Sequence, residues 1–226
     1  MLQQDEAIPI EVAKRLPAPD LLRKVLAAQI IELSPNQAII RAARDKRFIW
    51  PTRSDHHDRF GTPAVMLDRE GDGPFWIYGA EDIFTAIVEG RLRNKIATAP
   101  GHFRFSAAAE NAVIAQLDFS EPLRLFDLSG EAVSVLGIYD ELRGPDYEWC
   151  QWLGWEIGKI IREHQGAVHG FVYPSRRNPG KVAYAISSCV KDVLETRLTV
   201  RTQRLVDTDE YARLVASPCC TDSDSL

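Results

Sequence analysis

The stretch FWIYGAEDIFTAIVE (residues 75–89) predicts the element on which the rest of the fold is built. Its first four residues are apolar or aromatic, which is typical of a short buried strand. A glycine then marks a turn, and Glu81 and Asp82 stand where a helix N-terminus favours negative charge. From Ile83 onward apolar residues recur at helical spacing, so a strand runs directly into a helix. Glu89 lies about two helical turns beyond Asp82, at the edge of the apolar stripe. It is either an ordinary boundary residue or a carboxylate that points into a cleft.

The composition indicates a globular protein with one core. A chain of 226 residues can bury one sizeable core but is short for two domains, and its apolar fraction of 45% and charged fraction of 26% are ordinary. The formal net charge of −5 argues against direct binding to nucleic acid, which normally requires a basic surplus. Small groups of arginines at residues 41–47 and 176–177 still allow a local pocket for a small anion.

The compartment is expected to be the cytoplasm. No apolar run approaches the about 20 residues that span a bilayer, and the acidic beginning of the chain does not resemble a secretory signal. The cysteines lack metal-type spacing, and a reducing compartment fits them. They are Cys150, Cys189, Cys219 and Cys220.

The pattern of the chain predicts a single α+β domain over residues 17–217, after a polar lead-in (1–16) of uncertain order and before a disordered tail (218–226). Short, mixed, mostly antiparallel strands are expected at residues 38–42, 64–67, 75–78, 113–117, 123–128, 168–173, 182–187 and 198–206. Helices are expected from Leu21 through the following apolar stripe, at 81–93 with a basic last turn at 91–95, from Ser129, at 147–164, and from Asp209 to about Val215. Residues 45–61 are expected to form a loop and residues 68–74 a hairpin turn.

Familiar catalytic signatures are absent from the sequence. It contains no GxGxxG after a strand, no P-loop, no GxSxG and no HExxH. The adjacent His56 and His57 point in different directions and have no partner at metal-ligand spacing, so a solvated loop is the better interpretation and no metal site is expected. What remains is a set of polar residues at expected strand ends, and each by itself has an ordinary structural interpretation. These residues are Arg41, Arg59, Tyr78, Glu89 and Ser175.

Two longer stretches favour a functional interpretation of these residues over the ordinary structural one. IYGAEDIFTAIVE (residues 77–89) resembles the strand–helix segment of the RES domain family, which has a tyrosine at the strand end and a glutamate eleven positions later. GFVYPSRRNPG (residues 170–180) resembles the later signature of the same family, a Tyr-Pro-Ser step followed by arginine and a glycine-containing turn. IIRAA (residues 39–43) lies where the family has its first arginine, although Arg44 and Arg47 are close by. Arg59 and Phe60 lie where it has a second arginine followed by an aromatic residue.

The resemblance implies a fold and an activity. RES proteins are toxins of bacterial toxin–antitoxin pairs with a fold similar to that of ADP-ribosyltransferases. They consume NAD by hydrolysis or phosphorolysis, or pass its ADP-ribose to a protein. The partner is usually a helix-turn-helix (Xre-like) antitoxin that covers the active site. NAD is then a substrate and no cofactor is implied. A homo-oligomer, protein ADP-ribosylation and a non-catalytic binding module all remain open alternatives.

The resemblance also assigns residues. The Arg, Glu and Ser of the family name correspond to Arg41, Glu89 and Ser175, the implied catalytic set. Glu89 would stabilise the oxocarbenium-like state in which the nicotinamide–ribose bond breaks, and Ser175 would hold the ribose or orient Glu89. Arg41 and Arg59 would bind the pyrophosphate, because guanidinium groups match phosphate oxygens bidentately. The implied NAD-binding set is completed by Tyr78, which would flank the nicotinamide ring, and by Tyr173 and Arg177.

Overall fold

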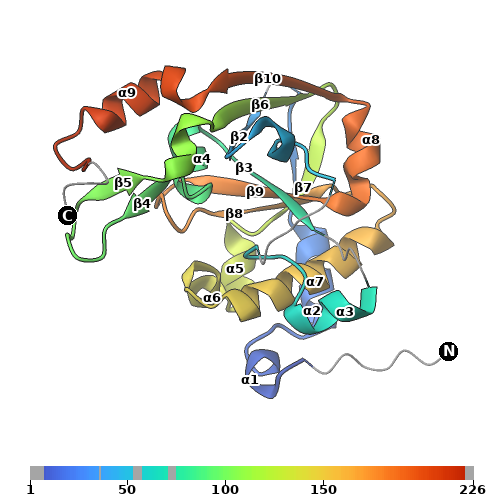
Figure 1. Ribbon diagram of the computed structural model, residues 1–226. Coiled ribbons are helices and arrows are strands. Elements are labelled where there is room, and N and C mark those ends of the chain that lie inside the picture. The colour runs from blue at the N-terminus through green and yellow to red at the C-terminus, as the bar shows by residue number, and fades with distance from the viewer. Residues whose placement is uncertain (1–7, 36, 53–57, 71–74, 222–226) are drawn as a thin grey trace.

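The computed structural model describes residues 8–35, 37–52, 58–70 and 75–221, without the side chains of 68–70. In this part of the chain, eight strands form one mixed sheet, and a two-stranded sheet lies beside it (Figure 1). Across the large sheet the order is β1 (Ile30–Leu33), β7 (Leu123–Asp127), β8 (Gly170–Pro174), β9 (Val182–Ser187), β3 (Trp76–Ala80), β2 (Ile39–Ala43), β6 (Val113–Phe119) and β10 (Leu198–Arg204). Only the β7–β8 pair is parallel. The small sheet pairs β4 (Arg93–Lys95) with β5 (Phe103–Phe105). The predicted single α+β domain with a mostly antiparallel sheet is confirmed.

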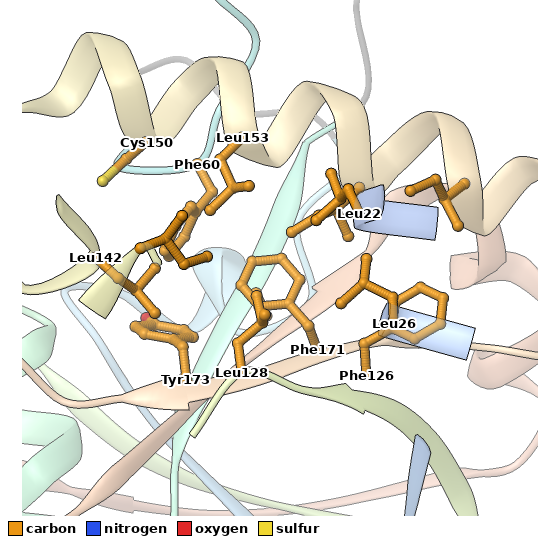
Figure 2. Close-up of a cluster of buried hydrophobic side chains, with 14 of the residues drawn as sticks. Leu22, Leu26, Phe60, Phe126, Leu128, Leu142, Cys150, Leu153, Phe171 and Tyr173 are labelled. Atoms are coloured by element: carbon orange, nitrogen blue, oxygen red, sulfur yellow. The ribbon is translucent and has the colours of Figure 1, made fainter. Parts of the chain in front are cut away.

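Side-chain alternation along the central strands builds a separate core on each face of the large sheet. On β8, Phe171 and Tyr173 belong to one buried cluster, whereas Val172 belongs to another. The first cluster packs under the helices α2 (Pro19–Ala28) and α7 (Tyr147–Glu163), as Figure 2 shows. The second includes Val190 and Leu194 at α8 (Lys191–Glu195). The central strands are therefore buried on both faces, which fixes their register.

The helix α4 (Ile83–Glu89) covers the sheet next to the first core. Asp82 caps it by accepting a hydrogen bond from the Thr85 backbone N at 2.7 Å. Ile87 packs in a third cluster with Ile40 and Ala42 of β2, and Ile40 is paired with Ala80 of β3. The register therefore places α4 and α7 over the same face of the sheet.

Several expected boundaries were wrong. The helix that was expected over 81–93 ends at Glu89, and residues 93–95 form β4 instead of a basic last turn. Arg91 explains the ending, because its φ of 56° is the left-handed conformation that terminates helices. Residues 64–67, expected as a strand, belong to the helix α3 (Ala64–Glu70). There Met66 is buried while Val65 and Leu67 are exposed, a pattern that a short apolar run does not reveal.

The described residues of the lead-in and the tail, 8–16 and 218–221, form contacts that the sequence did not predict. In the lead-in, α1 (Ile10–Ala13) buries Val12 in the first core, and Arg15 forms an ion pair with Asp146 at 2.6 Å. Residues 218–221, expected to be disordered, run beside β5, where the Phe103 backbone N donates to the Cys219 carbonyl at 2.9 Å. Residues 1–7 and 222–226 lie outside the described part, as do His56, His57 and residues 71–74 of the expected hairpin turn.

The remaining elements agree with the pattern of the sequence or add short pieces to it. The expected short helix after Ser129 is α5 (Glu131–Leu136), and the final helix is α9 (Asp209–Val215). The sequence analysis did not predict α6 (Tyr139–Arg143). It was also wrong in extending the first helix to Ile31, because α2 ends at Ala28 and β1 begins at Ile30. Single-turn helices at Lys46–Phe48, Ala107–Glu110, Ser188–Val190 and Leu205–Asp207 complete the described chain.

Candidate active site

A cavity of about 570 Å³ opens between the end of α4, the strands β2 and β3, and the beginning of α7. Its volume lies within the range of about 300–1,000 Å³ that is usual for sites that bind small molecules. Among the described residues, six arginines but only two carboxylates, Asp58 and Glu89, line it. The arginines are Arg41, Arg44, Arg59, Arg91, Arg176 and Arg177. Although the whole chain is acidic, the cavity is strongly basic and suits an anionic ligand.

Glu89 is held in one orientation by the turn that follows β8. Its Oε1 accepts a hydrogen bond from Ser175 Oγ at 2.6 Å and another from the Arg177 backbone N at 3.2 Å. Ser175 Oγ in turn accepts from the Asn178 backbone N at 2.9 Å, which fixes the direction of the serine hydroxyl. Within the described chain, Glu89 Oε2 has no hydrogen-bond partner. The carboxylate is therefore anchored through one oxygen, and the other remains available to a ligand in the cavity.

The same turn is tied to the rest of α4. Asn178 Nδ2 donates to Thr85 Oγ1 at 2.8 Å, and Lys181 Nζ lies 3.2 Å from Asp82 and 3.3 Å from Glu81. Partial burial raises the pKa of Asp82, but its hydrogen bonds with Thr85 and Lys181 outweigh this effect and lower the pKa overall. The contacts link α4 to the beginning of β9 at several points, so Glu89 and Ser175 keep their relative positions.

The partly buried Tyr78 and the buried Tyr173 form an aromatic wall of the cavity. The Tyr78 hydroxyl accepts a hydrogen bond from the Phe60 backbone N at 3.1 Å, and the Tyr173 ring lies edge-on to Phe60 with centroids 4.9 Å apart. Burial raises the pKa of both phenols, so both are neutral at physiological pH. Neutral aromatic faces suit a flat ring such as a nucleobase or a pyridine.

Arg41 is engaged mainly by the protein backbone. Strands β2 and β3 are paired at a single position, Ile40 with Ala80. Next to that position Arg41 Nη1 donates to the Tyr78 carbonyl at 2.5 Å, and Arg41 Nε donates to the Phe48 carbonyl at 2.9 Å. Burial lowers the pKa of Arg41 to about 10, so it stays charged at neutral pH. Arg41 thus joins β2, β3 and the Lys46–Phe48 turn.

Arg59 is only 8% exposed and lines the cavity beside the aromatic wall. Its Nη2 donates to the Leu142 carbonyl, and its guanidinium lies over the rings of Phe60 and Tyr173, 5.2 and 5.8 Å from their centroids. Its Nε and Nη1 are buried and find no hydrogen-bond partner in the described chain. Most of the donors of Arg59 are therefore covered by the protein, although the residue contributes to the lining of the cavity.

The sequence analysis missed three residues at the mouth of the cavity. Arg91 donates to the Tyr147 hydroxyl, and the guanidinium groups of Arg91 and Arg176 lie 5.6 and 5.5 Å from the centroid of the Tyr147 ring. With Arg177 these residues form a group that we call the arginine rim. The Arg176–Arg177 pair was visible in the sequence as a basic group. Arg91 had been interpreted as a helix-terminal charge, and Tyr147 only as the start of α7.

The structure thus brings together all of the residues singled out from the sequence. Arg41, Arg59, Tyr78, Glu89, Tyr173 and Arg177 line the cavity, and Ser175 lies behind Glu89. The described residues contain no group of three His, Cys, Asp or Glu side chains that would hold a metal ion. None of the described helices is long and apolar enough to cross a membrane.

Comparisons with known proteins concern the family and the fold of the chain. The family model of the RES domain matches residues 54–209, a range that includes the proposed site residues except Arg41. No curated protein gives a significant match. Among solved structures, a chain of the crystal structure of the M. tuberculosis MbcT–MbcA toxin–antitoxin complex is similar, with a TM-score of 0.52 and 19% identity over 88% of this chain and 100% of that chain. At this identity the likeness concerns the fold. Because the family model covers more than half of the sequence, the chain belongs to the RES domain family.

Proposed function

We propose that this protein is a RES-type toxin that degrades NAD by cleaving the bond between nicotinamide and ribose. The observation that carries the proposal is Glu89, whose Oε1 is fixed by Ser175 and the Arg177 backbone N inside a basic cavity. A dinucleotide with a negatively charged diphosphate and a flat pyridinium ring matches both the charge and the aromatic wall of this cavity. The similarity in fold to a chain of a toxin–antitoxin complex supports the toxin assignment.

The arrangement suits cleavage at the anomeric carbon of the nicotinamide ribose. As the carbon–nitrogen bond breaks, its electron pair goes to the ring nitrogen and nicotinamide leaves as a neutral molecule. The ribose then carries positive charge, which the Glu89 carboxylate stabilises through Oε2 or by holding a ribose hydroxyl. Water or phosphate forms the new bond to carbon and loses its proton to solvent. No covalent enzyme intermediate is needed.

The other residues position the substrate and the carboxylate. Tyr78 and Tyr173 flank the nicotinamide ring. Because both side chains are neutral, the Glu89 carboxylate is the group that stabilises the positive charge on the ribose. Ser175 acts through Glu89, because its hydroxyl hydrogen already points at Oε1. Arg41 maintains the cavity wall by joining three backbone segments. We further propose a protein antitoxin of the helix-turn-helix (Xre-like) class as the partner of the chain.

The test is the NAD concentration over time with purified protein, with and without phosphate. Wild-type protein is expected to consume NAD, and Glu89→Gln is expected to lower the rate by at least about 10³-fold, because the amide cannot stabilise positive charge. Glu148→Gln, an exposed residue at the start of α7, serves as the control and is expected to retain activity. A strict requirement for phosphate would identify phosphorolysis, and NAD loss at the same rate without phosphate would identify hydrolysis.

Two outcomes would redirect the proposal. NAD loss that requires an added protein, with labelled ADP-ribose on that protein, would identify a protein ADP-ribosyltransferase. No loss under any condition, together with tight NAD binding, would identify a non-catalytic RES-like binding module. A fully active Glu89→Gln variant would contradict the assignment of Glu89.

A further inference from the structure

The three arginines of the arginine rim have one carboxylate, Glu89, beside them in the cavity. Arg177 is half-buried, yet its guanidinium makes no hydrogen bond or ion pair within the described chain. Burial and the neighbouring Arg91 lower the pKa of Arg177, and Glu89 raises it, but the pKa is lowered overall. The positive charges therefore exceed the nearby negative charge, and a bound anion relieves the repulsion between them.

The rim is also held open in a defined arrangement. The Tyr147 ring lies between Arg91 and Arg176, and Arg176 Nη1 donates to the Gly144 carbonyl at 2.9 Å. These contacts use one nitrogen of each guanidinium and leave the remaining donors for a ligand. Arg91 adopts an uncommon left-handed φ of 56°, which brings its side chain to the mouth of the cavity beside Tyr147. The side chains of Arg91 and Arg176 are thus held in place before a ligand binds.

The two arginines that the sequence assigned to the pyrophosphate are less available. Arg41 uses Nε and Nη1 for backbone carbonyls that hold the sheet together. Arg59 gives Nη2 to a carbonyl, and its Nε and Nη1 are covered by surrounding atoms. A phosphate needs several exposed donors at one place, and the rim supplies them better than either of these side chains.

We infer that the arginine rim (Arg91, Arg176, Arg177, arranged around Tyr147) is the subsite for the diphosphate of the dinucleotide, in place of Arg41 and Arg59. The inference rests on the proposed function and names the residues that would hold the charged part of its substrate. The Arg177 backbone N contacts Glu89 Oε1, so a diphosphate on the Arg177 side chain lies next to the reacting carboxylate. The nicotinamide ribose then reaches Glu89 while the adenosine half extends toward solvent.

Binding of ADP tests the subsite without requiring turnover. ADP carries the diphosphate but has no nicotinamide–ribose bond, and adenosine serves as the probe that lacks the diphosphate. Calorimetric titration of both ligands is compared for wild type, Arg177→Gln and the double variant Arg91→Gln/Arg176→Gln. Arg104→Gln is the charge-matched control, because Arg104 is exposed on β5 and is not among the described residues that line the cavity. A thermal melt of each variant shows that it is folded.

Arg177→Gln and the double variant are each expected to weaken ADP binding by about tenfold or more, since each removes charge-assisted hydrogen bonds. Arg104→Gln is expected to change ADP binding by less than about threefold, because the loss of an exposed charge outside the cavity is screened by solvent. The inference is overturned if all three variants weaken ADP equally or not at all, or if adenosine binds wild type as tightly as ADP. Displacement of ADP by inorganic phosphate at concentrations near the Kd of ADP would make free phosphate the occupant and would also overturn it. Failure of the NAD assay alone would remove the cleavage reaction and leave these binding results unaffected.

Discussion

The two sides of the cavity differ in whether the protein itself supplies partners for their charged groups. On the Glu89 side, the carboxylate oxygen Oε1 receives two hydrogen bonds, and the turn after β8 is tied to α4 by further contacts. On the arginine rim, the guanidinium groups of Arg91 and Arg176 lie against the Tyr147 ring, and in the described chain no ion pair joins them or Arg177 to a carboxylate. The protein itself holds Glu89 in place through Oε1, whereas the guanidinium groups of the rim keep donors that only a ligand would use. Such a division is expected of a site in which a fixed group performs chemistry and a charged surface recruits the substrate.

Among the substitutions that test this contrast, Ser175→Ala is expected to have the largest effect. Ser175 is 2% exposed, and Ser175→Ala removes the hydroxyl that orients Glu89. We expect kcat for NAD cleavage to fall by about 10- to 100-fold, the range for residues that orient a reacting group, with little change in KM. Ser187→Ala is the matched control, because Ser187 is 1% exposed and its Oγ accepts a backbone hydrogen bond outside the cavity. Equal losses of activity in both variants would show that Ser175 acts only through stability.

The cap of α4 tests whether rigidity on the Glu89 side matters. Asp82→Ala removes the acceptor for the Thr85 backbone N and a partner of Lys181. The free energy of unfolding is expected to fall by about 1 kcal/mol, and kcat several-fold, because the cap begins the helix that ends at Glu89. Thr208→Ala removes the cap of α9 and is expected to cost similar stability without loss of kcat. Urea titration and NAD turnover measure both, and an unchanged kcat in Asp82→Ala would contradict the expectation.

Tyr147 offers a smaller effect on the rim. Tyr147→Phe keeps the ring between Arg91 and Arg176 but removes the hydroxyl to which Arg91 donates. We expect KM for NAD to rise by about three- to tenfold with kcat unchanged, because one donor of the rim loses its orientation. Tyr139→Phe is the control, since Tyr139 lies under Arg143 in a similar contact outside the cavity. A fall in kcat at constant KM would instead place Tyr147 in the chemical step.

The smallest expected effect is a change in how folding stability depends on pH, caused by a residue of the sheet that lies outside the cavity. His169 precedes β8, the strand that leads to Ser175, and burial together with Arg197 and Arg124 lowers its pKa. Because the unfolded chain binds the proton more readily, folding stability falls as the pH drops below about 6.5, the ordinary pKa of histidine. His169→Gln keeps an acceptor for the Arg124 backbone N and should reduce this dependence. Urea midpoints at pH 7.5 and 5.5 measure it, and an identical pH dependence in both proteins would rule out His169 as its source.

Local sequence patterns predicted much of the fold. The periodicity of α7 and the strand–helix step from β3 into α4 were visible because both elements bury one well-defined stripe or run of residues. The strand predicted at residues 64–67 was wrong because four apolar residues do not distinguish a strand from a helix. The end of α4 was placed too late because it depends on the backbone conformation of a single residue, Arg91.

The sequence by itself determined the family and predicted Glu89 and Ser175 as site residues, since the two motifs around them are continuous along the chain. Only the tertiary structure decided how those residues meet. Strand β3 pairs with β9 and β2, so segments about ninety positions apart become neighbours, and Ser175 reaches Glu89. The arginine rim also depends on the tertiary structure, because Arg91, Tyr147 and Arg176 come from three separate segments. Their individual sequence environments are ordinary, and their shared charge becomes apparent only when the sheet brings them to one cavity.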